Sequence, residues 1–341
     1  NHFCKKFKKR IYLISYDSTL KLDKSINIIE PVLQFKIKNR IFKYLVCIIS
    51  LIKFYTKNKH FVIFSFQANV YAIFIARILN QKIIIRVNAA PDKWITNYKK
   101  IVLKYFYRMA DKIIVNSYEF KKEVSKILNV DSKVIYNPIN REKIIKLSKK
   151  KSYLPFFDNF KQGIKILNIG RLTFQKNQID LLKTINILKE KMPIRLLIVG
   201  NGKEKISLKK YIYKKKLSKH VKILPYTKNP YIYFKKANIF ILTSIYEGLP
   251  NVLLEATLLK LLAISYKCKS GPKEILKNGK GGILVDIYNY KKIASEILKY
   301  HLSKNKKTYK KMITYSYKNI KNYEIKKQLT KYEDLVSFYL K

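Results

Sequence analysis

Two glutamates stand close together in segment 238–256 (NIFILTSIYEGLPNVLLEA), where a strand is predicted to give way to a helix. Apolar residues predict a strand to about Ser244, and Pro250 stands where a helix can begin without needing an N–H donor. Glu247 then lies in the loop, and Glu255 lies about one turn into the helix. Glu247 can accept hydrogen bonds from sugar hydroxyls, and Glu255 from a ribose diol. The alternative is that both acids only cap and solubilise the helix.

The start of this helix also offers a place for an anion. The first backbone amides of a helix have no partner within it, and the helix dipole favours negative charge there. These amides belong to residues near Leu249, Asn251 and Val252. We therefore expect an anion to bind beside Glu247.

A pair of cations follows the predicted strand 164–169. Gly170, Arg171 and Leu172 come directly after the strand, and Lys176 follows four residues later. Loops at the carboxyl ends of parallel strands line the ligand crevice of an α/β sheet. Arginine offers a planar fork of donors and lysine a point charge, so this pair suits a diphosphate.

All nine glycines lie between residues 163 and 282, and several follow predicted strands. Glycine lets backbone N–H groups approach a phosphate, because no Cβ intervenes. The phosphate-bearing ligand is therefore expected in the second half of the chain. Gly200 and Gly202 follow a strand, but no third glycine completes a dinucleotide motif. Glu204 stands where a Walker A loop needs Ser or Thr, so neither NAD binding nor ATP hydrolysis is supported.

The chain is strongly basic, with 73 Lys and Arg residues against 21 Asp and Glu residues and a net charge of +52. Lysine is spread over nearly every segment, whereas nucleic-acid binding needs the charge on one face with aromatics among it. We therefore expect no nucleic-acid partner, while the charge favours an anionic membrane surface. Segment 41–55 (IFKYLVCIISLIKFY) suits such an interface, although a helix that covers a sheet is the simpler interpretation.

Three scattered cysteines and four scattered histidines favour neither a disulfide framework nor a metal site. The longest stretch without a charged residue or histidine, 61–76, has sixteen residues, and spanning a bilayer takes about twenty. We expect a soluble, cytoplasmic protein.

Short apolar runs alternate with basic amphipathic stretches along the whole chain. The runs predict strands at 11–16, 61–66, 83–88, 112–116, 133–136, 164–169, 194–199, 221–224, 238–243, 262–266 and 282–285. The first-half stretches predict helices near 38–56, 70–80, 95–109 and 117–127. Apolar strands separated by helices indicate parallel sheets covered on both faces. The fold class is therefore α/β, with two Rossmann-like domains.

The two domains are expected at 1–150 and 151–305, joined by a Lys- and Ser-rich connection around 141–162, with further helices at 306–341. Residues 1–10 resemble the last turns of a basic helix. A doubly wound domain opens with a strand and a tight loop before that helix, so we expect an initial strand–loop–helix unit to be missing from this chain.

The motifs occur in the order found in family-4 retaining glycosyltransferases, and the chain resembles this family. The matching segments are Gly170-Arg171-Leu172 with Lys176, Gly200-Asn201-Gly202, Tyr246-Glu247-Gly248-Leu249-Pro250-Asn251 with Glu255-Ala256, and Gly271-Pro272 with Glu274-Ile275. Residues 110–117 and 136–140 match more weakly. The resemblance implies the GT-B fold, in which two Rossmann-like domains face each other across a cleft that holds the active site.

The resemblance also implies residue roles. Arg171 and Lys176 would hold the donor diphosphate, Glu247 would contact the transferred sugar, and Glu255 would bind the nucleoside ribose. Further donor contacts would come from Gly170, Gly200, Gly202, Gly248, Leu249, Pro250 and Asn251. Such enzymes need no metal or other cofactor, because protein cations neutralise the leaving diphosphate.

Several positions depart from the family pattern. Asn88 lies where many members have a histidine, and Arg86 and Asn88 are candidate contacts from the first domain. Lys260 and Leu262 replace a usual glycine and proline, and Pro225 replaces a usual glycine near the base pocket. These departures concern the donor more than the fold.

The implied enzyme is a retaining hexosyl- or N-acetylhexosaminyltransferase of bacterial surface glycan synthesis, such as polysaccharide or lipopolysaccharide. It would move a sugar from a UDP- or GDP-linked donor to a lipid-linked or saccharide acceptor, at the inner face of the cell membrane. The alternatives are a GT-B sugar-nucleotide epimerase, which needs no acceptor, and a basic protein that binds nucleic acid.

Overall fold

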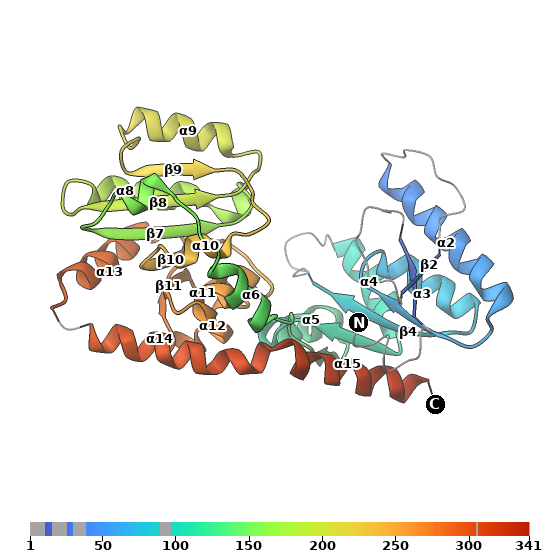
Figure 1. Ribbon diagram of the computed structural model, residues 1–341. Coiled ribbons are helices and arrows are strands. Elements are labelled where there is room, and N and C mark those ends of the chain that lie inside the picture. The colour runs from blue at the N-terminus through green and yellow to red at the C-terminus, as the bar shows by residue number, and fades with distance from the viewer. Residues whose placement is uncertain (1–10, 16–25, 30–38, 89–96, 305, 341) are drawn as a thin grey trace. The chain divides into compact units, whose positions relative to one another are not determined.

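The computed structural model describes residues 11–15, 26–29, 39–88, 97–304 and 306–340. The chain divides into two compact units (Figure 1). Unit 1 comprises residues 1–135 and 328–341, and unit 2 comprises residues 136–327. The prediction for residues 1–10 lies outside the described residues.

Unit 2 is built on a six-stranded parallel sheet. In the order β12-β11-β10-β7-β8-β9, its strands are Ile283–Val285, Leu262–Tyr266, Ile239–Leu242, Ile164–Ile169, Ile194–Val199 and Val221–Leu224. Nearly every residue of the four central strands is buried, because helices cover both faces. The continuous apolar runs of the sequence therefore correspond to a sheet with no solvent-facing side.

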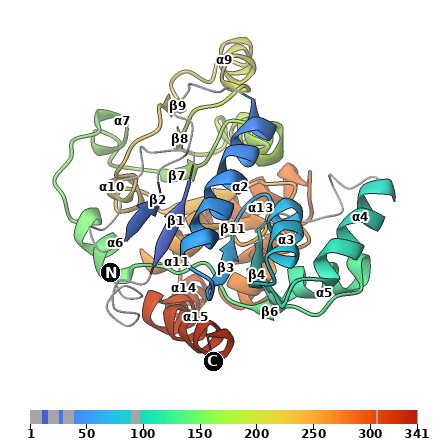
Figure 2. The same ribbon diagram turned by 90° about the vertical axis from the view of Figure 1, so that its right-hand side faces the viewer.

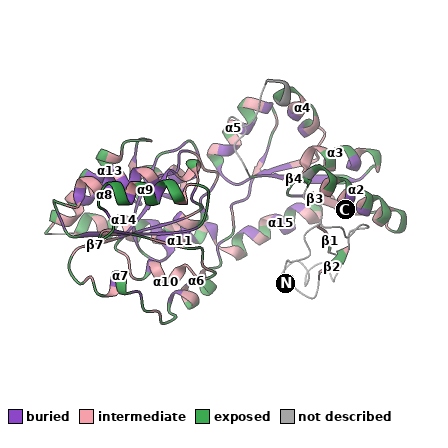
Figure 3. Cartoon of the chain, turned by 90° about the horizontal axis from the view of Figure 1, so that it is seen from above, coloured by how far each residue is buried: buried purple, intermediate pink, exposed green. Residues whose placement is uncertain are grey.

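The helices of unit 2 form two layers around this sheet. The longer helices are α8 (Gln178–Leu188), α9 (Lys205–Lys214), α11 (Asn251–Leu258), α13 (Tyr290–Leu302) and α14 (Lys307–Asn319). The short ones are α7 (Pro155–Asp158), η2 (Phe174–Lys176), α10 (Tyr231–Phe234), α12 (Pro272–Ile275), η3 (Lys277–Gly279) and η4 (Ile320–Tyr323). Figure 3 shows α8, α9 and α13 on one side of the sheet and α10 on the other.

Unit 1 has a four-stranded parallel sheet and a separate strand pair. The sheet runs β3-β4-β5-β6, with strands Val62–Ser65, Lys82–Val87, Lys112–Val115 and Lys133–Val134. The pair is β1 (Tyr12–Ile14) with β2 (Asn27–Ile29), and the helices are α2 (Arg40–Lys57), α3 (Asn69–Ile78), α4 (Asn97–Arg108) and α5 (Tyr118–Leu128). Because the strand order follows the sequence and crossovers are right-handed, α3, α4 and α5 cover one face of the sheet (Figure 2).

The last helix, α15 (Ile325–Tyr339), covers the opposite face of the unit 1 sheet from Gln328 onward. Tyr332 and Leu335 pack against Ile84 and Ile114 of the sheet. This helix gives unit 1 the second layer that its own N-terminal helices do not supply.

The predicted α/β class with two Rossmann-like parallel sheets is confirmed. All predicted strands occur, with ends that differ by at most two residues, and the sequence missed only the three-residue β2 among the described strands. The predicted connection around 141–162 instead contains α6 (Arg141–Ser148) and α7, both within unit 2. α6 forms there because Asn140 accepts the N–H of Lys143 as a cap, and Ile144 is buried.

Candidate active site

The centre of the unit 2 sheet opens toward its carboxyl edge. β7 and β10 are neighbours although two strands separate them in the sequence, so the winding of the sheet reverses between them. Their ladder ends at the pair Leu167 and Phe240. One residue later, the buried side-chain amide of Asn168 donates to the carbonyl of Ile241 at 2.8 Å. Ligands of open α/β sheets bind outside the strand ends at such a reversal.

The loop after β7 lies against the loop after β8 because glycines leave room for it. A Cβ on Gly200 would lie 1.9 Å from the carbonyl oxygen of Gly170, and a Cβ on Gly202 would lie 2.1 Å from that of Leu172. Leu172 donates its N–H to the carbonyl of Asn201 at 2.8 Å. The structure thus brings three predicted donor-binding glycines together at this edge.

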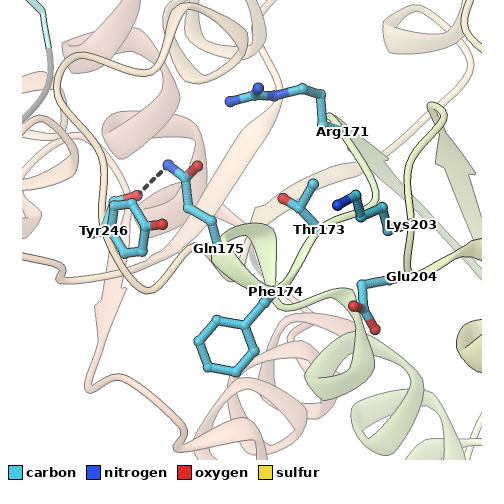
Figure 4. Close-up of a pocket in the computed structure, with 7 residues that line it drawn as sticks. All are labelled: Arg171, Thr173, Phe174, Gln175, Lys203, Glu204 and Tyr246. Carbon is cyan, nitrogen blue, oxygen red and sulfur yellow. Dashed lines mark hydrogen bonds between the residues drawn. The ribbon is translucent and has the colours of Figure 1, made fainter. Parts of the chain in front are cut away.

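The loop after β10 is hydrogen-bonded to η2. Thr243 Oγ1 donates to the carbonyl of Lys176 at 3.0 Å, and the N–H of Ile245 donates to the carbonyl of Gln175 at 2.9 Å. Gln175 Nε2 donates in turn to the carbonyl of Tyr246 at 2.9 Å (Figure 4). These bonds hold the two predicted functional loops in a fixed relation.

Lys176 and Glu247 form an ion pair between these loops. Lys176 Nζ lies 2.5 Å from Glu247 Oε1, and the two side chains are only 14% and 9% exposed. Ser270 Oγ donates to the backbone carbonyl of Glu247 at 2.5 Å. Removing one partner of so sheltered a pair would leave an uncompensated charge. Two predicted catalytic residues are therefore in direct contact, and each fixes the other.

A pocket of about 350 Å³ lies on the same loops and is drawn in Figure 4. It is lined by Arg171, Thr173, Phe174, Gln175, Lys203, Glu204 and Tyr246. Within the described part of the chain, the exposed side chains of Arg171 and Lys203 have no hydrogen bond or ion pair. Gln178 Nε2 donates to the carbonyl of Arg171 at 3.0 Å, which holds the backbone of this cation. The pocket thus presents two cations without an ion-pair partner among the described residues, together with the carboxylate of Glu204, which accepts from Ser207 Oγ at 2.9 Å.

Three buried side-chain oxygens near these loops also lack a partner among the residues that the structure describes. They are Asn168 Oδ1, Thr173 Oγ1 and Ser244 Oγ. Buried polar atoms in proteins normally have a hydrogen-bond partner, so such a group at one sheet edge is typical of a site that holds a polar ligand or water.

The N-terminus of α11 faces these loops without a side-chain cap. Its N-cap is Pro250, which supplies no cap hydrogen bond. Asn137 Nδ2 donates to the carbonyl of Leu249 at 3.2 Å and to Asn251 Oδ1 at 2.9 Å. A Cβ on Gly271, where φ is +86°, would lie 2.3 Å from the carbonyl oxygen of Gly248. The helix start is thus uncapped and packed against Asn137 and Gly271, and anion binding there stays a prediction.

Glu255 occupies α11 one turn beyond this start and contacts Tyr231 of α10. The Tyr231 hydroxyl donates to Glu255 Oε1 at 3.4 Å. Burial raises the pKa of the Glu255 carboxyl from 4.5 to about 7, and the hydrogen bond from Tyr231 only partly opposes this. Burial, together with this carboxylate, raises the pKa of Tyr231 to about 12. Glu255 therefore titrates near neutral pH.

Arg86 and Asn88, the predicted contacts from the first domain, lie at the carboxyl end of β4 in unit 1. Arg86 Nε donates to Asn88 Oδ1 at 2.9 Å, and its guanidinium lies 5.7 Å from the ring centre of Tyr332. Burial lowers the pKa of Arg86 to about 10. Arg86 and Asn88 therefore contact each other in unit 1, whereas the Lys176–Glu247 pair belongs to unit 2.

Sequence reasoning missed several residues of the unit 2 site. Lys203 stands just before Glu204, the residue that excluded a Walker A loop, and Gln175 and Tyr231 carry no motif at all. Asn137 was noted only as part of a weak match, and its contact with residues 249–251 lies 112 to 114 positions away in the chain. Contacts across such distances depend on the order of the strands.

The described residues contain no group of three or more His, Cys, Asp or Glu side chains that could hold a metal ion. Among the helices that the structure describes, none has the length and apolarity needed to cross a bilayer.

Residues 150–319 match the model of the family described as glycosyl transferases group 1. An uncharacterized glycosyltransferase of Methanocaldococcus jannaschii is 39% identical over 52% of this chain and 46% of its own length. The amylovoran biosynthesis glycosyltransferase AmsD of Erwinia amylovora is 33% identical over 54% of this chain and 51% of its own length. The N-acetylgalactosamine-N,N'-diacetylbacillosaminyl-diphospho-undecaprenol 4-alpha-N-acetylgalactosaminyltransferase of Campylobacter jejuni is 30% identical over 56% of this chain and 50% of its own length. The chain thus spans about half the length of these curated relatives.

Solved structures share the fold over nearly the whole chain. A glycosyltransferase from Rickettsia africae has a TM-score of 0.80 and 19% identity, with 98% of this chain and 92% of that chain covered. Anabaena HepE in complex with UDP has a TM-score of 0.73 and 15% identity, with 92% and 86% covered.

Proposed function

We propose, from the premise that this chain belongs to the glycosyl transferases group 1 family, that it transfers a sugar from a nucleotide-sugar donor to an acceptor with retention of configuration. The donor is UDP- or GDP-linked, and the transferred group is a hexose or N-acetylhexosamine. The acceptor is a lipid-linked molecule or a saccharide in bacterial surface glycan synthesis.

The observation that carries this proposal is the cluster at the carboxyl edge of β7 and β10. An unpaired Arg171, the Lys176–Glu247 ion pair and the uncapped start of α11 belong to adjoining loops. A diphosphate needs cations and N–H donors, and a sugar needs carboxylate acceptors. This edge provides both within one set of hydrogen-bonded loops.

In the proposed reaction, Arg171 and Lys176 hold the donor diphosphate and stabilise the negative charge that grows on it as the glycosidic bond breaks. Lys176 already contacts Glu247, so a phosphate that approaches this lysine leaves the sugar beside the Glu247 carboxylate. The sugar passes through an oxocarbenium-like state. The acceptor hydroxyl attacks from the face that the nucleotide leaves, and the donor phosphate takes its proton. No metal is needed, because protein cations carry the compensating charge.

Glu255 is proposed to bind the ribose diol of the donor. Its ionised form is the better acceptor for two hydroxyl donors, and burial makes that ionisation sensitive to pH near 7. Gly200 and Gly202 leave space for the loop that presents Arg171.

The nature of the acceptor is inferred from the relatives. AmsD is named for amylovoran biosynthesis, and the Campylobacter enzyme is named for a diphospho-undecaprenol acceptor. A lipid-linked acceptor of this kind would place the protein at the inner face of the cell membrane, with anionic lipid as a partner.

Titration calorimetry with UDP and GDP tests the donor site. Arg171→Gln should weaken binding of the preferred nucleotide roughly ten- to a hundredfold, because a charge-assisted hydrogen bond is lost. Lys210→Gln, an exposed cation on α9, is the matched control and should bind as wild type does. Equal binding by both variants would remove Arg171 from the site.

Transfer itself is tested with labelled sugar nucleotides and lipid-linked or saccharide acceptors. Glu247→Gln should abolish transfer, and the product of the wild type should keep the anomeric configuration of the donor. Full turnover by Glu247→Gln would refute its role. Conversion of the donor to an epimer without acceptor would instead identify an epimerase.

A further inference from the structure

Unit 1 exposes apolar side chains on one face of α2. Ile41, Leu45, Ile49 and Ile52 are spaced by three or four residues, so they lie on the same side of the helix. Each is between 41% and 59% exposed, whereas Val46 on the other side is buried. A helix that only covers a sheet turns its apolar residues inward and its polar residues outward. α2 has apolar residues on both sides.

The two neighbouring helices continue this surface. Tyr71, Phe74 and Ile78 form an outward row on α3, and Ile101 and Tyr105 form one on α4, all between 43% and 69% exposed. Figure 3 shows exposed residues along all three helices. We call the outward sides of α2, α3 and α4 the apolar face.

Aromatic contacts join the three helices into one surface. The rings of Tyr44 and Tyr71 lie 5.8 Å apart between α2 and α3, and those of Phe74 and Phe106 lie 6.5 Å apart between α3 and α4. Soluble monomers rarely expose contiguous apolar patches of this kind unless the patch contacts a partner or a membrane.

The charge of the same helices is of one sign. α2, α3 and α4 together contain nine Lys and Arg residues and no Asp or Glu. Lys53, Lys57, Lys100 and Arg108 are exposed. A second copy of this chain would place like charges against one another. An anionic bilayer instead accepts apolar side chains below its headgroups and basic side chains among them.

We propose that the apolar face of unit 1 docks on the surface of an anionic lipid bilayer. Its apolar side chains enter the interface, and its lysines and arginines contact the lipid headgroups. The docking surface comprises three helices rather than α2 alone. The purpose of this docking, access to a lipid-linked acceptor, rests on the proposed function. The docking itself does not, since binding to lipid can be measured without sugar transfer.

Vesicle flotation tests the docking. The wild type should float with vesicles of phosphatidylglycerol and phosphatidylcholine, should bind less at high salt, and should bind pure phosphatidylcholine weakly. The triple variant Leu45→Gln/Ile49→Gln/Phe74→Gln should bind the anionic vesicles more weakly than wild type, by a factor of about ten or greater. These side chains are about half exposed, so the variant should stay folded, which a cooperative thermal unfolding transition would show.

A matched control lies on α9 of unit 2, which also has only basic charged residues and two exposed apolar side chains. Ile206→Gln/Tyr213→Gln should leave vesicle binding unchanged, and Lys53→Glu/Lys100→Glu on the apolar face should reduce it. Equal binding by wild type and the triple variant would overturn the proposal, as would an equal loss in the α9 control. A dimer in sedimentation analysis that the triple variant dissociates, without lipid binding by wild type, would identify a second copy as the occupant and overturn it too.

Nucleotide binding separates this inference from the proposed function. The triple variant leaves unit 2 unchanged, so UDP or GDP should bind it as they bind the wild type. Retained nucleotide binding with no lipid binding by the wild type would overturn the docking alone. Lipid binding without nucleotide binding would support the docking and refute the donor site.

Discussion

Replacing Glu255 by Gln should make the protein more stable at alkaline pH and less able to bind its donor. Burial raises the pKa of the Glu255 carboxyl from 4.5 to about 7. The folded state therefore holds this proton more tightly than the unfolded state does. The protonated Glu255 side chain therefore stabilises the folded state. This stabilisation is fully present below about pH 4.5 and is lost as the pH rises through 7.

The size of the effect follows from the same pKa. At about 1.4 kcal/mol for each pH unit, the ionised carboxylate costs the folded state roughly 3 kcal/mol above pH 8. Glu255→Gln cannot ionise, and its amide oxygen can still accept the hydroxyl of Tyr231. For a unit of this size, about 3 kcal/mol corresponds to a melting temperature higher by roughly 6–10 °C. Near pH 5 the two proteins should melt within a degree or two of each other.

Thermal unfolding of ligand-free protein between pH 5 and pH 8.5 measures this difference. Glu190→Gln is the control, because the Glu190 side chain is 82% exposed, and it should shift the melting temperature equally at all pH values. A difference between wild type and Glu255→Gln that does not change with pH would refute the reasoning. Nucleotide affinity gives a second measurement, since wild-type binding should tighten from pH 6 to pH 8 and that of Glu255→Gln should stay weak and constant.

Three further results are expected. Gly200→Ala should destabilise unit 2 by about 1–3 kcal/mol in urea unfolding and weaken nucleotide binding, because its Cβ would lie 1.9 Å from the carbonyl of Gly170. Tyr266→Phe should cost about 1–3 kcal/mol in the same assay, because its buried hydroxyl donates to Asp180 Oδ2 at 2.9 Å, and an unchanged midpoint would contradict this. Incubation with EDTA should leave the rate of sugar transfer unchanged, whereas a loss restored by a divalent metal would refute a metal-independent reaction.

The sequence alone determined the local features of the site. The apolar run before Ser244 and the proline at 250 define a strand, a loop and a helix, and each depends on residues only a few positions apart. The positions of Glu247 and Glu255 follow from that local order. For the same reason the strands of both sheets could be placed to within two residues. The three-residue β2 was missed, because only Ile28 and Ile29 in it are apolar, whereas the similarly short β1, β6 and β12 lie within longer apolar runs.

Only the tertiary structure decided which of these groups act on one another. Lys176 and Glu247 are 71 positions apart and meet because β7 and β10 are neighbours in the sheet. The contact of Glu255 with Tyr231 and the burial that raises the pKa of Glu255 depend on tertiary contacts between residues 24 positions apart. The spacing of apolar residues in the sequence likewise could not distinguish the exposed apolar rows of α2, α3 and α4 from buried rows. Periodicity shows that a helix has an apolar side, and packing alone decides whether that side meets a sheet or remains exposed.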